Sequence, residues 1–186
     1  MSTGVPGGAD EGLGPGARGP SPAPVPVRHR LAFLVTAAFC LAADVATKWV
    51  VQQTMTVHEN HQVLGDWVRL TYIHNTGAAF GLFPGSRWAL IGVSVTAVAV
   101  VVWLAWYRSP RFSLALPLGM VLGGAVGNLI DRVRFGQVVD FINVGVGVHR
   151  WPVFNAADSA VTVGVVWLAV VLAFPEGGRR DPDTGP

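Results

Sequence analysis

The apolar residues of this chain are gathered into four long runs and are not spread at the spacing of a soluble core. The runs cover residues 31–51, 88–107, 112–130 and 156–174. A helix needs about 20 mostly apolar residues to cross a bilayer, and each run has about that length. The pattern therefore predicts an all-α membrane protein with four transmembrane helices.

The first run follows Arg28-His29-Arg30 and in this respect resembles the basic and apolar regions of a secretory signal peptide. Asp44 and Lys48 interrupt the run, however, and no convincing small-residue cleavage site follows it. We therefore expect a retained membrane helix. The third run contains Pro117 and several glycines, which disfavour an isolated helix but permit close contact between helices in a membrane.

The segment between the first and second runs has a different pattern. Apolar and polar side chains alternate within residues 55–87, most clearly over residues 67–74. Because alternation with a period of two is typical of a strand, we expect a small extracytoplasmic β-element here.

The composition of the two ends of the chain indicates where the folded part begins and ends. Residues 1–27 are rich in Gly, Pro, Ala and Ser, and they contain too few large apolar side chains to offset the entropy of ordering. We expect a disordered N-terminal tail over residues 1–27, a membrane domain over residues 28–175, and a cytoplasmic C-terminal tail over residues 176–186.

Basic residues at the ends of the runs predict the orientation. Four spans leave both termini on one side of the membrane, together with Arg28, Arg30, Arg108, Arg111, Arg179 and Arg180. Because basic residues are enriched on the cytoplasmic side, we expect both termini there. The opposite face carries Arg69, Arg87, Arg132, Arg134 and Arg150, so the asymmetry is modest. The expected surroundings are membrane lipid, and a formal net charge of +2 gives no support for nucleic-acid binding.

Ionisable and amide side chains cluster on the predicted extracytoplasmic side. The third run is followed by Asp131, Arg132 and then Asp140, and the fourth run begins beside Asp158; Asn128 and Asn155 lie within the same segments. Ionisable side chains within or beside membrane spans are disfavoured by about 2.5–3.5 kcal/mol on insertion scales, so each one suggests a function. Two carboxyl groups that share one proton are suited to peptide hydrolysis, one activating water and the other protonating the reacting groups.

Other chemistries have weaker support. Cys40 lies inside the first run without an evident histidine partner, and we interpret it as a small apolar residue. His58 and His61 are the only closely spaced histidines, and they lack the helical spacing of a metal site. We therefore expect no metal and no cofactor.

Four ordered segments resemble the signatures of the lipoprotein signal peptidase family, also called signal peptidase II. The segments are Asn75-Thr76-Gly77-Ala78-Ala79-Phe80, residues 123–132 (GGAVGNLIDR), Val138-Val139-Asp140-Phe141 and Phe154-Asn155-Ala156-Ala157-Asp158; Asp44 with Lys48 matches a further family pattern. The resemblance covers about residues 31–174 and is more specific than any single motif.

The resemblance implies a bacterial aspartic endopeptidase of the cytoplasmic (inner) membrane. Such an enzyme removes the signal peptide from prolipoproteins by cutting before their diacylglyceryl-modified cysteine. The catalytic residues would be Asp140 and Asp158, near the extracytoplasmic face. Site support or substrate binding would come from Asn75, Asn128, Arg132, Asn155, Asp44 and Lys48.

Simpler interpretations of these residues stay open. Asp131 beside Arg132 suggests an interfacial ion pair or a helix-end anchor, and Asp158 has a position that suits a helix cap. Asp44 and Lys48, four residues apart, suggest a structural pair on one helix face. We interpret Trp49, Trp67, Trp88 and Trp151 as interfacial residues.

Two other functions are compatible with the residues alone. A proton-coupled transporter or channel would use the same carboxyl groups as relay groups. A noncatalytic assembly factor would use the Asn and Asp side chains to bind helices. Cleavage of a diacylated prolipopeptide distinguishes both from a peptidase.

Overall fold

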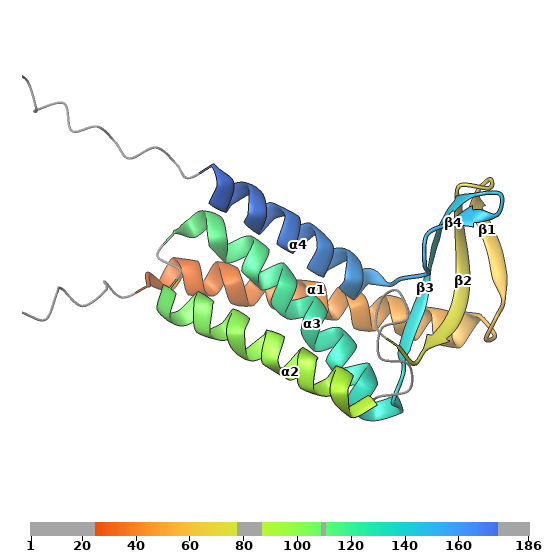
Figure 1. The fold of residues 1–186 in the computed structure, drawn as a ribbon, viewed down its shortest axis with the longest axis horizontal. Helices are drawn as coiled ribbons and strands as arrows, with labels where there is room; N and C mark the ends of the chain where they lie inside the picture. The colour runs from red at the N-terminus through yellow and green to blue at the C-terminus, as the bar shows by residue number, and fades with distance from the viewer. Residues whose placement is uncertain (1–24, 78–86, 109–110, 175–186) are drawn as a thin grey trace, which may run out of the picture.

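The computed structural model describes residues 25–77, 87–108 and 111–174, and contains the four expected helices of membrane-spanning length (Figure 1). They are α1 (Val27–Thr54), α2 (Arg87–Trp103), α3 (Ala115–Phe135) and α4 (Ala156–Ala173). Helix α2 continues into a wider helical turn, Leu104–Arg108, and a short 3₁₀ turn, Phe112–Leu114, leads into α3. The predicted helical membrane fold is confirmed.

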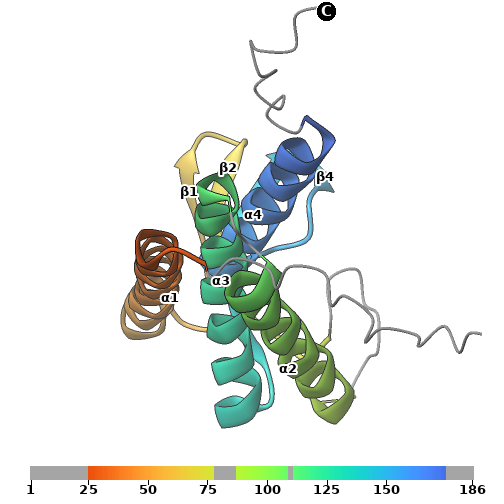
Figure 2. The same ribbon diagram turned by 90° about the vertical axis from the view of Figure 1, so that its left-hand side faces the viewer.

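Helix α3 occupies the centre of the bundle, with α1, α2 and α4 around it (Figure 2). Its glycines explain this position. A Cβ at Gly123 would lie 2.5 Å from the carbonyl oxygen of Ala37 in α1, and a Cβ at Gly124 would meet the carbonyl oxygen of Ala157 in α4. Only residues without a side chain allow α1 and α4 to approach α3 this closely.

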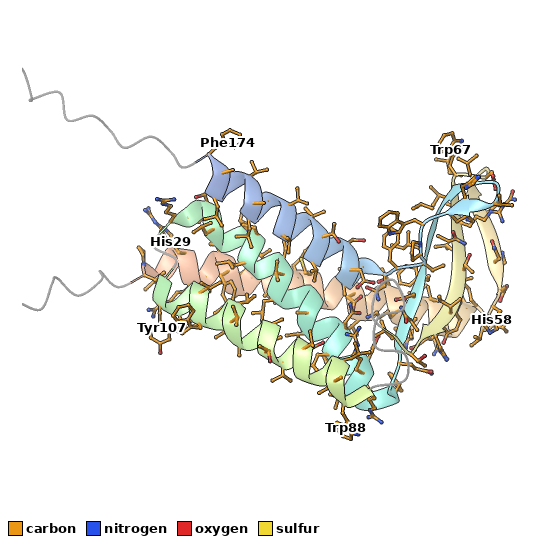
Figure 3. The ribbon with its side chains drawn as sticks, viewed as in Figure 1. His29, His58, Trp67, Trp88, Tyr107 and Phe174 are labelled. Atoms are coloured by element: carbon orange, nitrogen blue, oxygen red, sulfur yellow. The ribbon has the colours of Figure 1, made fainter. Side chains whose placement is uncertain are left out.

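The burial of the helices is typical of a membrane protein. Half of the apolar window of α3 is buried, but only 17–22% of the windows in the other three helices. Large apolar side chains therefore cover the outside of the bundle, where a lipid environment removes the cost of exposing them to water. Trp88, at the start of α2, is among these exposed side chains (Figure 3).

A four-stranded antiparallel sheet lies at one end of the bundle, in the order β1-β2-β3-β4 (Figure 1). Its strands are β1 (Asn60–Leu64), β2 (Val68–Asn75), β3 (Val138–Val146) and β4 (His149–Arg150). The alternating segment predicted the first two strands. The other two follow α3, in a part of the chain where no strand was expected.

The predicted tails fall mainly outside the described residues, which begin at Val25 and end at Phe174. Helix α1 begins at Val27, so the last residue assigned to the N-terminal tail is already helical. The first helix thus extends beyond both ends of the predicted span, residues 31–51.

Candidate active site

Asp140 is placed by the turn between α3 and β3. Gly136 ends α3 in the left-handed conformation, at a φ of 74°, which glycine adopts without a Cβ penalty. Side chains then alternate along β3, so Val139 packs with Val51, Tyr72 and other apolar residues on one face. Asp140 points to the opposite face and is 1% exposed.

Two asparagine amides hold the Asp140 carboxyl group. The Nδ2 atom of Asn155 donates to Oδ1 at 2.7 Å, and the Nδ2 atom of Asn75 donates to Oδ2 at 2.8 Å. Asn75 is paired in register with Val138, so its side chain and that of Asp140 are diagonal neighbours on one face of the sheet. The oxygen of the Asn75 side chain accepts the backbone N–H of Gly77 at 2.9 Å, which fixes the orientation of the amide.

Burial raises the pKa of Asp140 to about 7. The negative charge of Asp158 raises the pKa as well, whereas the hydrogen bonds from Asn75 and Asn155 lower it. Desolvation is the largest of these causes, because a dry environment disfavours the charged carboxylate. Asp140 therefore retains a proton far more readily than an exposed carboxyl group, whose pKa is about 3.9.

Asp158 lies in the first turn of α4 and also caps that helix. Asn155 is the N-cap residue: its side-chain oxygen accepts the backbone N–H of Asp158 at 2.9 Å, and Asp158 Oδ2 accepts the backbone N–H of Asn155 at 3.3 Å. The other carboxyl oxygen, Oδ1, accepts Asn128 Nδ2 at 2.7 Å. Asp158 thus does cap the helix, as the simpler interpretation predicted. Capping uses only Oδ2, however, and does not explain why Oδ1 accepts a hydrogen bond from Asn128.

A buried ion cluster lies behind Asp140 and Asp158, where α1 meets α3. Lys48 Nζ is 2.8 Å from Asp44 Oδ2, as the spacing of four residues predicted, and 2.8 Å from Asp131 Oδ2. Asp44 also accepts the backbone N–H of Ala157 at 3.0 Å, and Asp131 accepts that of Val139 at 3.3 Å. The cluster therefore fixes α1 against the start of α4 and α3 against β3.

Asp131 forms its ion pair with Lys48 and not with the neighbouring Arg132 that we expected. On a helix, adjacent residues point in different directions, which explains the difference. The Nη1 atom of Arg132 is 3.5 Å from both the Ser94 hydroxyl and the Asn128 carbonyl oxygen, and its side chain faces a cavity.

This cavity has a volume of about 1220 Å³ and brings Asp140 and Asp158 into one space. Its walls come from α2, α3, α4, the end of β2 and the segment that precedes α4. The polar part contains both carboxyl groups and Asn75, Asn128 and Arg132. The remainder is largely apolar, including Val93, Ala97, Val161, Val163, Trp151 and Phe154.

The comparisons with known proteins agree with this geometry. A model of the family described as signal peptidase (SPase) II matches residues 36–174. The chain belongs to the signal peptidase II family. A lipoprotein signal peptidase of Moorella thermoacetica is 41% identical over 152 residues, which cover 81% of this chain and 99% of that protein. One of Syntrophus aciditrophicus is 40% identical over 144 residues, covering 74% of this chain and 89% of that protein.

Solved structures show the same fold. A bacterial membrane enzyme determined at 2.3 Å superposes with a TM-score of 0.75 and 25% identity, covering 87% of this chain and 98% of that one. A second, determined at 1.9 Å, has a TM-score of 0.71 and 26% identity, with coverages of 82% and 97%. The predicted family is confirmed by the family model and by these relatives, and the predicted fold by the solved structures.

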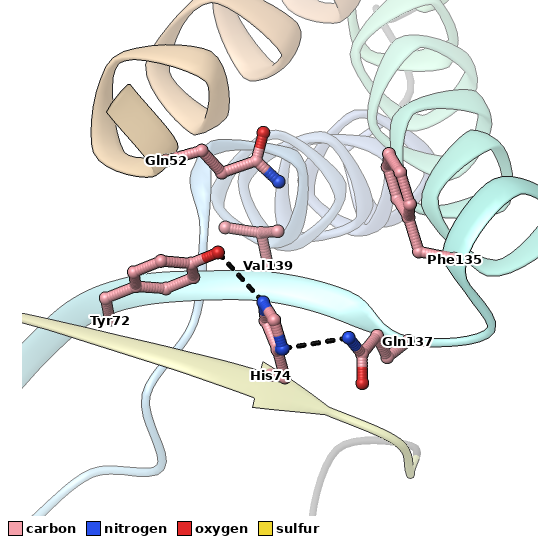
Figure 4. Close-up of a pocket in the computed structure, with 6 residues that line it drawn as sticks. All are labelled: Gln52, Tyr72, His74, Phe135, Gln137 and Val139. Atoms are coloured by element: carbon pink, nitrogen blue, oxygen red, sulfur yellow. Dashed lines mark hydrogen bonds between the residues drawn. The ribbon is translucent and has the colours of Figure 1, made fainter. Parts of the chain in front are cut away.

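The structure also contains a smaller cavity, of about 200 Å³, on the other face of β3 (Figure 4). Here Tyr72 Oη lies 2.8 Å from His74 Nε2, and His74 Nδ1 lies 2.8 Å from Gln137 Nε2. His74 is paired in register with Val139 and so faces away from Asp140. His74 also lines the large cavity, so the two cavities adjoin at the end of β2.

Several cavity residues were missed from the sequence. Ser94 gave no signal within an apolar run, and the wall formed by Trp151, Pro152 and Val153 lies in a segment without a regular pattern. All eight predicted site residues do lie in one connected network. Six line the cavity or hydrogen-bond the two carboxyl groups, and Asp44 and Lys48 lie behind them.

Proposed function

We propose that Asp140 and Asp158 are the catalytic pair of a membrane aspartic endopeptidase that removes signal peptides from prolipoproteins. The observation that carries this proposal is their shared position in one large cavity. Within the described residues, neither carboxyl group has a cationic partner in an ion pair, and both accept hydrogen bonds from amides. Family membership favours a peptidase over the transporter and the assembly factor.

The two carboxyl groups divide the chemistry. Asp140, whose pKa is raised to about 7, holds the proton and donates it to the oxygen of the scissile carbonyl. Asp158 takes a proton from water, and the water oxygen attacks the carbonyl carbon. When the tetrahedral intermediate collapses, the C–N bond breaks, Asp158 returns its proton to the leaving amine, and Asp140 regains one from the intermediate.

The finer substrate assignment rests on the family and on the shape of the cavity. The relatives are named lipoprotein signal peptidases. The cavity has apolar walls from α2 and α4, such as Val93 and Val163, next to its two acids. This arrangement suits a peptide whose cysteine carries a diacylglyceryl group, with the acyl chains along the apolar wall and the preceding bond at Asp140 and Asp158.

The proposed location is the bacterial cytoplasmic membrane, with both termini in the cytoplasm and the site near the extracytoplasmic face. The distribution of arginines at the helix ends supports this orientation. It is tested by single cysteines placed at Trp67 and at Phe174 in a Cys40→Ala background. An impermeant thiol reagent added to intact cells should label the first and not the second.

Cleavage of a synthetic diacylated prolipopeptide by the purified protein tests the activity. Wild type should cut before the modified cysteine, whereas Asp140→Asn and Asp158→Asn should each lose on the order of 10²–10⁴-fold in rate. Ion-dependent flux without cleavage would support a transporter. Near-wild-type turnover in either variant would refute the assigned pair.

A further inference from the structure

Asn128 connects the buried ion cluster to one of the two acids. Its side-chain oxygen accepts Lys48 Nζ at 3.0 Å and Asn155 Nδ2 at 3.1 Å, while its own Nδ2 donates to Asp158 Oδ1 at 2.7 Å. The exposed fraction of Asn128 is 7% and that of Lys48 is 4%, so water does not compete freely for these bonds.

The chemistry of an ammonium group decides which way the Asn128 amide points. Lysine has three donors and no acceptor, so the atom of Asn128 that faces Lys48 has to be the oxygen. The NH₂ group is then directed toward Asp158. In the reversed orientation, NH₂ would face the ammonium and the amide of Asn155, and the oxygen would face the Asp158 carboxyl group.

Lys48 is itself held in one position. Asp44 and Asp131 each contact its ammonium at 2.8 Å, and these carboxylates are anchored by the backbone N–H groups of Ala157 and Val139. Two carboxylates around one ammonium leave one of its three protons for Asn128. Hydrogen bonds are therefore donated in one direction, from Lys48 in α1 to Asn128 in α3 and from Asn128 to Asp158 in α4.

We propose that Lys48 is a positioning residue for the reaction, because it locks the amide of Asn128 so that its NH₂ group orients Asp158 to take a proton from water. This inference rests on the proposed function of Asp158. It assigns Lys48 a part in the rate that its structural ion pairs alone do not require.

Lys48→Gln and Lys48→Met form a matched pair for the test. Both remove the charge from a side chain of similar length, but only Gln retains an N–H donor for the Asn128 oxygen. Cleavage of the diacylated prolipopeptide is measured, with kcat and KM separated, alongside thermal unfolding in detergent. We expect Lys48→Met to lose about 10- to 100-fold in kcat, the equivalent of one hydrogen bond to a charged group, with little change in KM. Lys48→Gln should recover most of that loss.

Equal kcat values for the two variants, at similar unfolding temperatures, would overturn the proposal, because the donor would then be irrelevant. Wild-type protein without cleavage would instead refute the peptidase function itself. The two failures are thus distinguishable in one series of measurements.

Asn128→Asp provides a second test that retains Lys48. The charged groups around this position are Lys48, Asp131, Arg132, Asp140 and Asp158. One carboxyl oxygen of the new residue can accept Lys48, but the other donates to Asp158 only when it is protonated. We expect the pH optimum of cleavage to move to lower pH. A profile of unchanged shape, only scaled down, would contradict the proposal even if the Lys48 variants do not fold.

Discussion

Two pairs of aspartates lie close together in this molecule and have opposite surroundings. Asp44 and Asp131 share the ammonium of Lys48 in a buried cluster between α1 and α3. Asp140 and Asp158 face a cavity and accept hydrogen bonds from neutral amides. Asn128 connects the two pairs through one amide group.

The difference shows what makes a buried carboxyl group available for chemistry. A carboxylate in direct contact with an ammonium is held in place by the ion pair, which suits the joining of helices. A carboxyl group that only amides contact can change its protonation state more readily, because the nearby cations, Lys48 and Arg132, form no ion pair with it. The partner, and not the residue type or the depth of burial, distinguishes the two roles.

The largest effect should come from the cavity pair. We expect Asp140→Asn combined with Asp158→Asn to be no slower than the worse single variant, because the two groups act as one unit. The measurement is the single-turnover rate of prolipopeptide cleavage for both single variants and the double variant. Losses that multiply would show two independent roles and would weaken the comparison.

The pH dependence of cleavage should follow the raised pKa of Asp140. Its protonated form is required as the acid, so kcat/KM should fall about tenfold per unit as the pH rises above about 7. Burial favours the neutral form in the folded state. Asp140 therefore stabilises the fold below about pH 4, and this contribution is lost as the pH rises through about 7. The midpoint belongs to the coupled pair, and a flat profile between about pH 6 and 9 would contradict this assignment.

Asp44→Asn should affect stability more than chemistry. It replaces the carboxylate that contacts Lys48 and the Ala157 N–H, and we expect a loss of about 1–3 kcal/mol in the free energy of unfolding. The cleavage rate of the folded fraction should fall by less than about tenfold. Denaturant unfolding in detergent micelles and active-site-normalised rates check both statements. A rate loss as large as that of Asp140→Asn would remove the distinction between the pairs.

The smallest effect is expected from Asp66→Asn, which serves as the control carboxylate. Asp66 lies in the turn between β1 and β2, where it is partly exposed, and pairs with Arg69 and Arg150. The backbone N–H of Gly147 and these arginines hold its pKa below the usual value. Because Asp66 does not line the large cavity, the cleavage rate of the folded protein should stay within about twofold of wild type in the same assay. A larger loss would show that the outer part of the sheet takes part in the reaction.

The amino-acid sequence determined the four spans and singled out Asp140 and Asp158 as the candidate acids. Hydrophobic runs of bilayer length have few alternatives, because each backbone polar group in lipid requires a partner within the helix. The alternating pattern likewise predicted β1 and β2. Strands β3 and β4 escaped notice because Asp140 and two glycines interrupt the alternation, and the register with β2 is a long-range property.

Only the tertiary structure decided which charges are partners. Adjacent residues suggested that Asp131 pairs with Arg132, but the packing of α1 on α3 presents Lys48 to Asp131 instead. Glycines in α3 allow α1 to pack this closely, because a Cβ at Gly127 would meet the carboxylate of Asp44. Local sequence records which side chains are present, whereas electrostatic partners depend on distances between helices that are far apart along the chain.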